Sequence, residues 1–183
     1  MRLVILGGPG SGKSTQAKNL HKALNLPLIS TGDILRDAIA SQSPLGLKAQ
    51  AYVLAGELLP DVLMIQFIRQ RLSKSDLQGN WLLEGYPRTA FQAEELDFLL
   101  EELKQPLHWA IYLEISETTM MTRSLERSLV DDQLPIIRNR IATFHQRTVP
   151  ILEYYQGTQR LLTIPGESQS ETVTQDLLTR LSA

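Results

Sequence analysis

The feature that most constrains this chain is a glycine-rich segment near its start, at residues 7–15. A short apolar run at residues 3–6 precedes it, and a segment typical of a helix follows it to about residue 24. The pattern is G-x-x-x-x-G-K-S between a buried strand and a helix, which is the context that a phosphate-binding loop requires. Glycines let backbone N–H groups turn towards a phosphate, and the start of the helix adds its positive dipole end. The sequence therefore predicts a polyphosphate site directly after the first strand.

Two side chains of this segment carry the predicted chemistry. Lys13 would supply a mobile positive charge to the outer phosphates, and Ser14 would supply a hydroxyl to Mg²⁺. The alternative interpretation is a glycine-rich turn that merely joins a strand to a helix. Four glycines in register, followed directly by the lysine and the serine, favour phosphate binding.

Composition limits the classes of protein to which the chain can belong. Its 183 residues fit one domain, and 43% hydrophobic content is ordinary for a globular protein with a sizeable core. A net charge of −2 without blocks of like charge argues against nucleic-acid binding, and the absence of Cys excludes disulfides and Cys-based zinc sites. The first apolar run is too short for a signal peptide and no stretch could span a bilayer, so we expect no membrane association and a cytoplasmic location.

Short apolar runs alternate with helical segments along the whole chain. The expected strands are residues 2–6, 26–29, 81–83, 109–115 and 161–164. The expected helices are residues 13–24, 31–55 with a restart near residue 44, 62–73, 89–104, 117–130, 132–156 and 170–181. This alternation predicts an α/β fold, in which a five-stranded parallel sheet has helices on both faces and ligands bind beyond the carboxyl ends of the strands.

Individual residues indicate where these helices begin or bend. Thr31 is a plausible N-cap of the second helix, and Ser43 with Pro44 should restart it. Asp131 should cap the long helix that runs to about residue 156. Pro150 should kink that helix, because proline lacks the N–H of an interior hydrogen bond.

A second group of polar residues follows the third strand. Glu84 ends this strand, beside the phosphate loop, where such proteins hold Mg²⁺, often through water; its alternative role is a charge that favours the start of the next helix. The rigid turn of residues 85–88 would aim Arg88 at the ligand site. Thr89 and Gln92 match a capping box, so Gln92 has an equally good structural explanation.

Arginine is the commoner cation in this chain, with 12 Arg against 6 Lys. Its planar guanidinium binds phosphate through two hydrogen bonds, although ordinary surface usage accounts for many arginines. Arg123 and Arg127 lie four apart on one predicted helix, and Arg138 and Arg140 lie early in the next. Such pairs usually form a solvated face, but beside a phosphate loop we favour ligand binding, because phosphoryl transfer depends on positioning and charge compensation.

Several segments, taken in order, resemble the signatures of the adenylate kinases, a family of nucleoside monophosphate kinases. They are residues 7–15, 30–36, 56–61, 84–89, 131–140 and 150–155. The match covers nearly the whole chain, which makes the resemblance specific. It implies a P-loop nucleotide kinase fold with a single domain at residues 1–183, a small helical insertion that binds the monophosphate at residues 30–59, and a minimal lid at residues 128–130.

The resemblance also implies the reaction ATP + AMP ⇌ 2 ADP, with Mg²⁺ as cofactor and ATP, AMP and ADP as the ligands. ATP would be bound by Gly10, Ser11, Gly12, Lys13, Ser14, Thr15, Arg127 and Ser168. AMP would be bound by Thr31, Arg36, Glu57, Leu58, Leu59, Gly85, Tyr86, Pro87, Arg88, Gln92 and Arg140. The catalytic residues would be Lys13, Arg88, Arg123, Arg127 and Arg140, with Ser14 and Glu84 as the metal-binding residues. The segment at residues 166–168 would lie beside the adenine of ATP, although Ser168 also fits a capping box with Glu171.

Three features depart from the family pattern. Ser14 stands where the family usually has glycine, and Glu84 replaces the usual aspartate. Only three residues separate Arg127 from Asp131, and Leu129 falls at about the place of an arginine that even short lids carry. Because lid closure excludes water, as in the adenylate kinases themselves, we expect a working enzyme with slower chemistry or more ATP hydrolysis than its relatives.

Two other functions stay open. The chain could be a nucleotide sensor without turnover, or a kinase of another nucleoside monophosphate or small phosphate acceptor. Thr89 and Gln92 resemble the residues of the AMP-reading type, and the retained lysine and arginines favour an enzyme over a sensor. By analogy with short-lid relatives, we expect a monomer.

Overall fold

The central element is a five-stranded parallel sheet with the strand order β2-β3-β1-β4-β5. This computed structural model describes residues 1–54, 59–126 and 133–182. The strands are β1 (Arg2–Gly7), β2 (Leu28–Ser30), β3 (Trp81–Glu84), β4 (Trp109–Glu114) and β5 (Leu161–Pro165). The predicted fold class is therefore confirmed, with β2 starting two residues later than expected.

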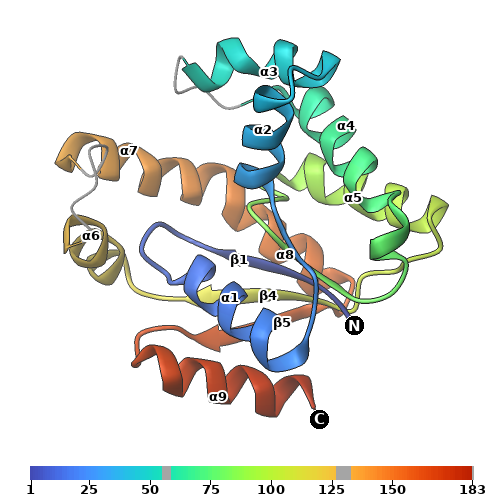
Figure 1. The fold of residues 1–183 in the computed structure, drawn as a ribbon. Helices are drawn as coiled ribbons and strands as arrows, with labels where there is room; N and C mark the ends of the chain where they lie inside the picture. The colour runs from blue at the N-terminus through green and yellow to red at the C-terminus, as the bar shows by residue number, and fades with distance from the viewer. Residues whose placement is uncertain (55–58, 127–132, 183) are drawn as a thin grey trace.

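Helices cover both faces of this sheet (Figure 1). Along β1 the side chains alternate: Val4 and Leu6 join one buried hydrophobic cluster, and Leu3 and Ile5 join another. The first cluster includes residues from α4 (Asp61–Leu72), α5 (Ala90–Glu102), α6 (Glu117–Glu126), α7 (Leu134–Thr143) and α8 (Val149–Gly157). The second includes residues from α1 (Lys13–Leu24) and α9 (Ser170–Leu181). An unbroken apolar run is thus what a strand needs when both of its faces are buried.

Two short helices, α2 (Thr31–Ala40) and α3 (Pro44–Leu54), lie beyond the sheet and next to α4 (Figure 1). They share a third, small hydrophobic cluster that includes Leu45, Leu59 and Phe67. Ser43 caps α3 as predicted, because its Oγ accepts a hydrogen bond from the N–H of Gly46 at 3.1 Å. The prediction for α2 was wrong by one residue: β2 continues to Ser30, whose Oγ accepts from the N–H of Asp33 and forms the N-cap.

The long helix expected at residues 132–156 is interrupted. The described part begins with α7, then passes through a π-helical turn, Phe144–Thr148, before α8. Pro150 lies in the first turn of α8, as the predicted position of a kink requires. Proline cannot bond to the carbonyl four residues earlier, and the wider π turn accommodates that missing bond. Asp131, the predicted cap, lies outside the described residues.

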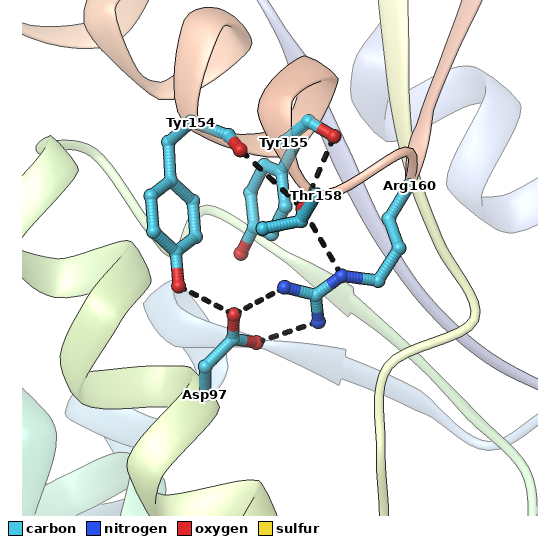
Figure 2. A network of polar contacts seen from close by, with 5 residues as sticks. All are labelled: Asp97, Tyr154, Tyr155, Thr158 and Arg160. Atoms are coloured by element: carbon cyan, nitrogen blue, oxygen red, sulfur yellow. Dashed lines mark hydrogen bonds and ion pairs between the residues drawn. The ribbon is translucent and has the colours of Figure 1, made fainter.

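A polar network ties α5 to the segment between α8 and β5 (Figure 2). Arg160 pairs with Asp97 through both nitrogens of its fork, one of them at 2.9 Å, and the hydroxyl of Tyr154 donates to the same carboxylate at 2.6 Å. Burial and Asp97 raise the pKa of Tyr154 to about 12, so this hydroxyl keeps its proton at neutral pH. The network lies at the amino end of β5, opposite the carboxyl ends of the strands, and stabilises the fold away from the predicted ligand site.

Across the described segments, every helix is too short or too polar to cross a bilayer. A short 3₁₀ helix, Ser75–Leu77, joins α4 to β3.

Candidate active site

The loop between β1 and α1 adopts the conformation that its glycines predict. Gly10 and Gly12 have positive φ angles of 69° and 85°, in the left-handed region that glycine adopts without strain. Gly12 is also the N-cap of α1. A Cβ at Gly10 would lie 3.0 Å from the carbonyl oxygen of Met120 and 3.2 Å from the Cβ of Arg123, so α6 packs directly against the loop.

The Lys13 ammonium lies inside this loop. Its Nζ donates to the carbonyl oxygens of Gly7 and Gly8, both at 2.7 Å, and lies 3.4 Å from the hydroxyl of Ser11, which is buried. These contacts hold a positive charge next to the backbone N–H groups at the start of α1. Such an arrangement can bind the phosphates of a nucleotide.

Ser14, at the start of α1, contacts Glu84, at the end of β3. Glu84 ends β3, which pairs with β1, and its carboxylate accepts a hydrogen bond from the Ser14 hydroxyl at the start of α1. A hydroxyl and a carboxylate are hard oxygen ligands of the kind that Mg²⁺ prefers. The residues present therefore fit a magnesium ion held mainly by the phosphates of a nucleotide. Among the residues that the structure describes, no group of three or more His, Cys, Asp or Glu side chains could hold a metal.

The turn after β3 lies against the start of α2. Gly85 has a φ of +88°, and a Cβ there would overlap the hydroxyl of Thr31, a residue that is itself buried. The segment continues with a buried Tyr86, whose hydroxyl donates to the carbonyl oxygen of Gln92 at 3.1 Å. The predicted ligand-binding residues at the start of α2, in the turn after β3 and on α5 thus come together beyond the carboxyl ends of the strands, beside the loop after β1.

Arg88 is held at its backbone and at its guanidinium. Its N–H donates to the Gln92 Oε1 at 2.7 Å, and its Nε donates to the carbonyl oxygen of Gly85 at 2.9 Å. The Arg88 side chain is exposed to solvent on one side. The protein around the rest of it lowers the pKa of the guanidinium by desolvation, and the nearby negative charge of Glu84 raises that pKa in part. Because a guanidinium is too basic to lose its proton in a protein, Arg88 stays charged and can pair with an anion.

Gln92 forms only half of the capping box that the sequence predicts. The Thr89 hydroxyl accepts from the N–H of Gln92 at 3.1 Å, as expected for an N-cap. The Gln92 side chain does not accept from the N–H of Thr89, as a full capping box would require. Its Oε1 accepts from the N–H of Arg88, and its Nε2 donates to Asp61 Oδ1 at 2.6 Å. Asp61 lies in the family-like segment at residues 56–61, but sequence reasoning gave it no role in the site, because its contact with Gln92 joins residues 31 apart in the chain.

Arg123 contacts the loop that follows β5. Its guanidinium donates to the carbonyl oxygens of Gly166 at 2.8 Å and Glu167 at 2.7 Å. The Glu167 carboxylate in turn accepts from the N–H of Ser116 at 2.8 Å and the hydroxyl of Thr119 at 2.9 Å, and these hydrogen bonds lower its pKa. The start of α6 and the segment predicted to lie beside the ATP adenine are therefore joined.

The remaining predicted site residues lie on separate helices and loops, or outside the residues that the structure describes. Arg36 is exposed and pairs with Asp33 on its own helix, and Arg140 lies on α7 with a partly exposed side chain. Leu59 packs into the small cluster of α2 and α3. The capping box expected at Ser168 is not formed, since α9 has Gln169 as its N-cap without a side-chain hydrogen bond. Arg127, Glu57 and Leu58, and the predicted lid at residues 128–130, lie outside the described residues.

Fold and site together define a P-loop α/β protein, with a phosphate-binding loop after the central strand of a parallel sheet and an arginine-containing turn after its neighbour. A family model described as adenylate kinase matches residues 5–160. The chain is 61% identical to adenylate kinase 2 of a Synechocystis species over 99% of this chain and 100% of that protein. It is 60% identical to adenylate kinase 2 of a Nostoc species over 97% of both chains, and 41% identical to an adenylate kinase of Corynebacterium urealyticum over 99% of both. The chain belongs to the adenylate kinase family, as its sequence motifs predicted.

Proposed function

We propose that this chain catalyses the reversible transfer of the terminal phosphoryl group of ATP to AMP, giving two molecules of ADP. The observation that carries the proposal is the adjacency of two anion-binding elements. The loop after β1 holds the Lys13 ammonium, and the turn after β3 holds the Arg88 guanidinium, and the Ser14–Glu84 hydrogen bond joins the two. Family membership supports the same reaction.

On the donor side, residues 10–15 would bind the phosphates of ATP. Backbone N–H groups at the start of α1 face the anion there, and Lys13 would move from the loop carbonyls to the outer phosphates. The segment at residues 166–168 would lie beside the adenine of ATP, and Arg123 joins that segment to α6. Arg127, which the sequence assigns to ATP, lies outside the described residues.

On the acceptor side, AMP would lie between α2 and the turn after β3. Thr31 and Gly85, which pack together, would line the AMP site. Arg36 and Arg88 would bind the AMP phosphate, and Gln92 would contact the adenine. Arg36 would leave Asp33 for that phosphate, an exchange that costs little because an exposed ion pair contributes little to stability.

Magnesium completes the donor side in this proposal. Ser14 and Glu84 would hold the ion, directly or through water, because they bring a hydroxyl and a carboxylate together beside the phosphate loop. When bound, Mg²⁺ neutralises negative charge on the phosphates of ATP.

The chemistry needs no general base. The attacking atom is a phosphate oxygen of AMP, whose second pKa is near ~6, so this phosphate is largely dianionic at pH 7. The transferring group spreads its charge over three oxygens, and positioning and charge compensation supply most of the catalysis. Lys13, Arg88, Arg123, Arg127 and Arg140 are the residues we propose for that compensation.

Mixing the protein with ATP, AMP and MgCl₂ and following ADP by chromatography tests the proposal. We expect ADP formation that requires both nucleotides and Mg²⁺, and we expect ADP alone to be converted back into ATP and AMP. Binding of both nucleotides without turnover would instead indicate a sensor. CMP, UMP and GMP in place of AMP test for a kinase of another acceptor, since faster reaction with one of them would overturn the choice of AMP.

The remaining sequence predictions belong to the same proposal. The segment at residues 30–59 would be the insertion that binds the monophosphate, residues 128–130 would form a minimal lid, and the enzyme would act as a cytoplasmic monomer. A short lid should exclude water poorly, so ADP production from ATP in the absence of AMP measures its effect.

A further inference from the structure

The side-chain amide of Gln92 contacts two groups of opposite hydrogen-bonding character. Its Oε1 accepts from the backbone N–H of Arg88 at 2.7 Å, and its Nε2 donates to the Asp61 carboxylate at 2.6 Å. A backbone N–H can only donate and an ionised carboxylate can only accept. The chemistry of the two partners therefore decides which end of the amide carries oxygen and which carries nitrogen.

Burial makes this orientation costly to reverse. Gln92 is only 6% exposed, and Asp61 occupies the first turn of α4 with a partly buried side chain. A turned amide would place Oε1 against the Asp61 carboxylate and Nε2 against the N–H of Arg88. Two hydrogen bonds would become two contacts, one between two acceptors and one between two donors, and the burial of Gln92 limits how far water can compensate for them.

One donor and one acceptor of the amide remain for a ligand. Gln92 has two N–H groups and two oxygen lone pairs, and Asp61 and Arg88 use one of each. Adenine offers an amino donor at position 6 and an acceptor nitrogen at position 1. Hypoxanthine has nearly the same shape, but it carries a carbonyl acceptor at position 6 and an N–H donor at position 1. A fixed amide therefore suits only one of the two bases.

From this arrangement we propose that Asp61 is a specificity-determining residue, which acts by holding the Gln92 amide in the orientation that accepts AMP and rejects inosine monophosphate, IMP. The proposal rests on the proposed function, because it assumes that the acceptor base lies beside Gln92. Asp61 is a positioning residue here, because it acts through Gln92. Its effect would appear as a change in selectivity between bases that differ at positions 1 and 6.

The Asp61→Asn variant tests the proposal, with initial rates measured against AMP and against IMP at saturating ATP. Asparagine can turn either its oxygen or its nitrogen towards Gln92, so one of the two penalties for turning the amide is removed. We expect the IMP-to-AMP ratio of kcat/KM to rise by about tenfold, which is the effect of one hydrogen bond to a charged group. The change should appear mainly in the KM of the acceptor, with kcat for AMP within about twofold of the parent.

Three further variants separate positioning from general structural damage. Asp61→Glu keeps the carboxylate and should keep selectivity for AMP. In a Gln92→Ala background, Asp61→Asn should leave the IMP-to-AMP ratio unchanged. Glu171→Gln removes a carboxylate from the first turn of another 12-residue helix, α9, and should leave the ratio at the parent value. If Asp61→Asn does not fold, Asp61→Ser applies the same test, because serine suits a helix start and its hydroxyl can donate or accept.

An unchanged ratio in a folded Asp61→Asn or Asp61→Ser variant would overturn the proposal, and so would an equal rise in the Gln92→Ala background. Failure of the proposed function looks different. In that case the parent protein itself would form no ADP from ATP and AMP, whereas failure of the present inference leaves the parent active and selective.

Discussion

The donor and acceptor sides of this site are built in different ways. On the donor side, the hydrogen bonds that hold the Lys13 ammonium in its loop, among the described residues, go to Gly7, Gly8 and Ser11, at most six residues away along the chain. On the acceptor side, Gln92 contacts Asp61, 31 residues away, and Gly85 packs against Thr31. The bonds that hold Lys13 in the phosphate loop are thus local, although α6 and Glu84 also contact the loop and the start of α1. The acceptor side exists only after α2, α4 and α5 have packed together.

This difference affects how each side can fail. A substitution in the loop removes a charge from a structure that otherwise stays intact. A substitution on the acceptor side also removes a contact to a residue on another helix or turn. It therefore changes both the contact with the ligand and the orientation of neighbouring side chains.

The largest effect is expected from Lys13→Met, which removes the positive charge of the donor side. We expect kcat to fall by about a thousandfold, the scale of losing one preorganised group that stabilises the transition state. The melting temperature should stay within a few degrees of the parent value, because Lys13 belongs to none of the hydrophobic clusters formed by the described residues. Lys18→Met, at an exposed position of the same helix, is the matched control and should retain activity. Comparable losses in both variants would contradict a specific role for Lys13.

A smaller effect is expected from Arg88→Ala on the acceptor side. We expect kcat/KM for AMP to fall by about a hundredfold, since charge-assisted hydrogen bonds contribute about 1.5–3 kcal/mol each. The KM for ATP should change little, because the phosphate loop keeps its own contacts. Arg69→Ala, which removes an exposed ion pair with Glu102, serves as the control for losing an arginine. Equal increases in the KM of both nucleotides would show that the two sides are not separable.

Asp97→Asn should lower stability without changing the reaction. The carboxylate accepts from Arg160 and Tyr154 in a partly buried network far from the phosphate loop (Figure 2), so its loss should cost about 2 kcal/mol in the free energy of unfolding. Asp76→Asn removes an exposed carboxylate that pairs with Arg71 and should lower the free energy of unfolding by less. Urea unfolding of both variants measures the difference, and kcat below the transition should match the parent. Equal costs would mean that the network contributes no more than a surface pair.

The smallest effect is a pH dependence at Glu167. Hydrogen bonds from Ser116 and Thr119 lower the pKa of this carboxyl, so its ionised form stabilises the folded state. That contribution is present above the pKa of the unfolded chain, near ~4.3, and is lost as pH falls through the folded value. The melting temperatures of the parent and of Glu167→Gln should therefore differ at pH 7 and converge in acid below ~pH 4. A difference that persists unchanged at low pH would contradict this account.

The family, the fold class and most element boundaries could be predicted from the sequence. Apolar runs located the five strands, and the phosphate loop with Lys13 and Ser14 was recognisable because its function depends on neighbours in the chain. Boundary errors were local: Ser30 rather than Thr31 caps α2, because β2 continues one residue further than its apolar run indicates. The π turn before Pro150 was foreseen only as a kink, since a missing hydrogen bond can be accommodated in several ways.

The tertiary structure decided which partners the polar side chains took. Gln92 matched a capping box in the sequence, yet its amide joins Arg88 to Asp61, because the packing of α4 against α5 places a carboxylate there. Arg123 joins α6 to the loop after β5 for a similar reason. Periodicity and local motifs predict only interactions between residues that are close in sequence. The buried amide of Gln92 has one partner four residues away, at Arg88, and a second, Asp61, that only folding brings within 3 Å from 31 residues away. The identity of that second partner cannot be read from any short segment of the chain.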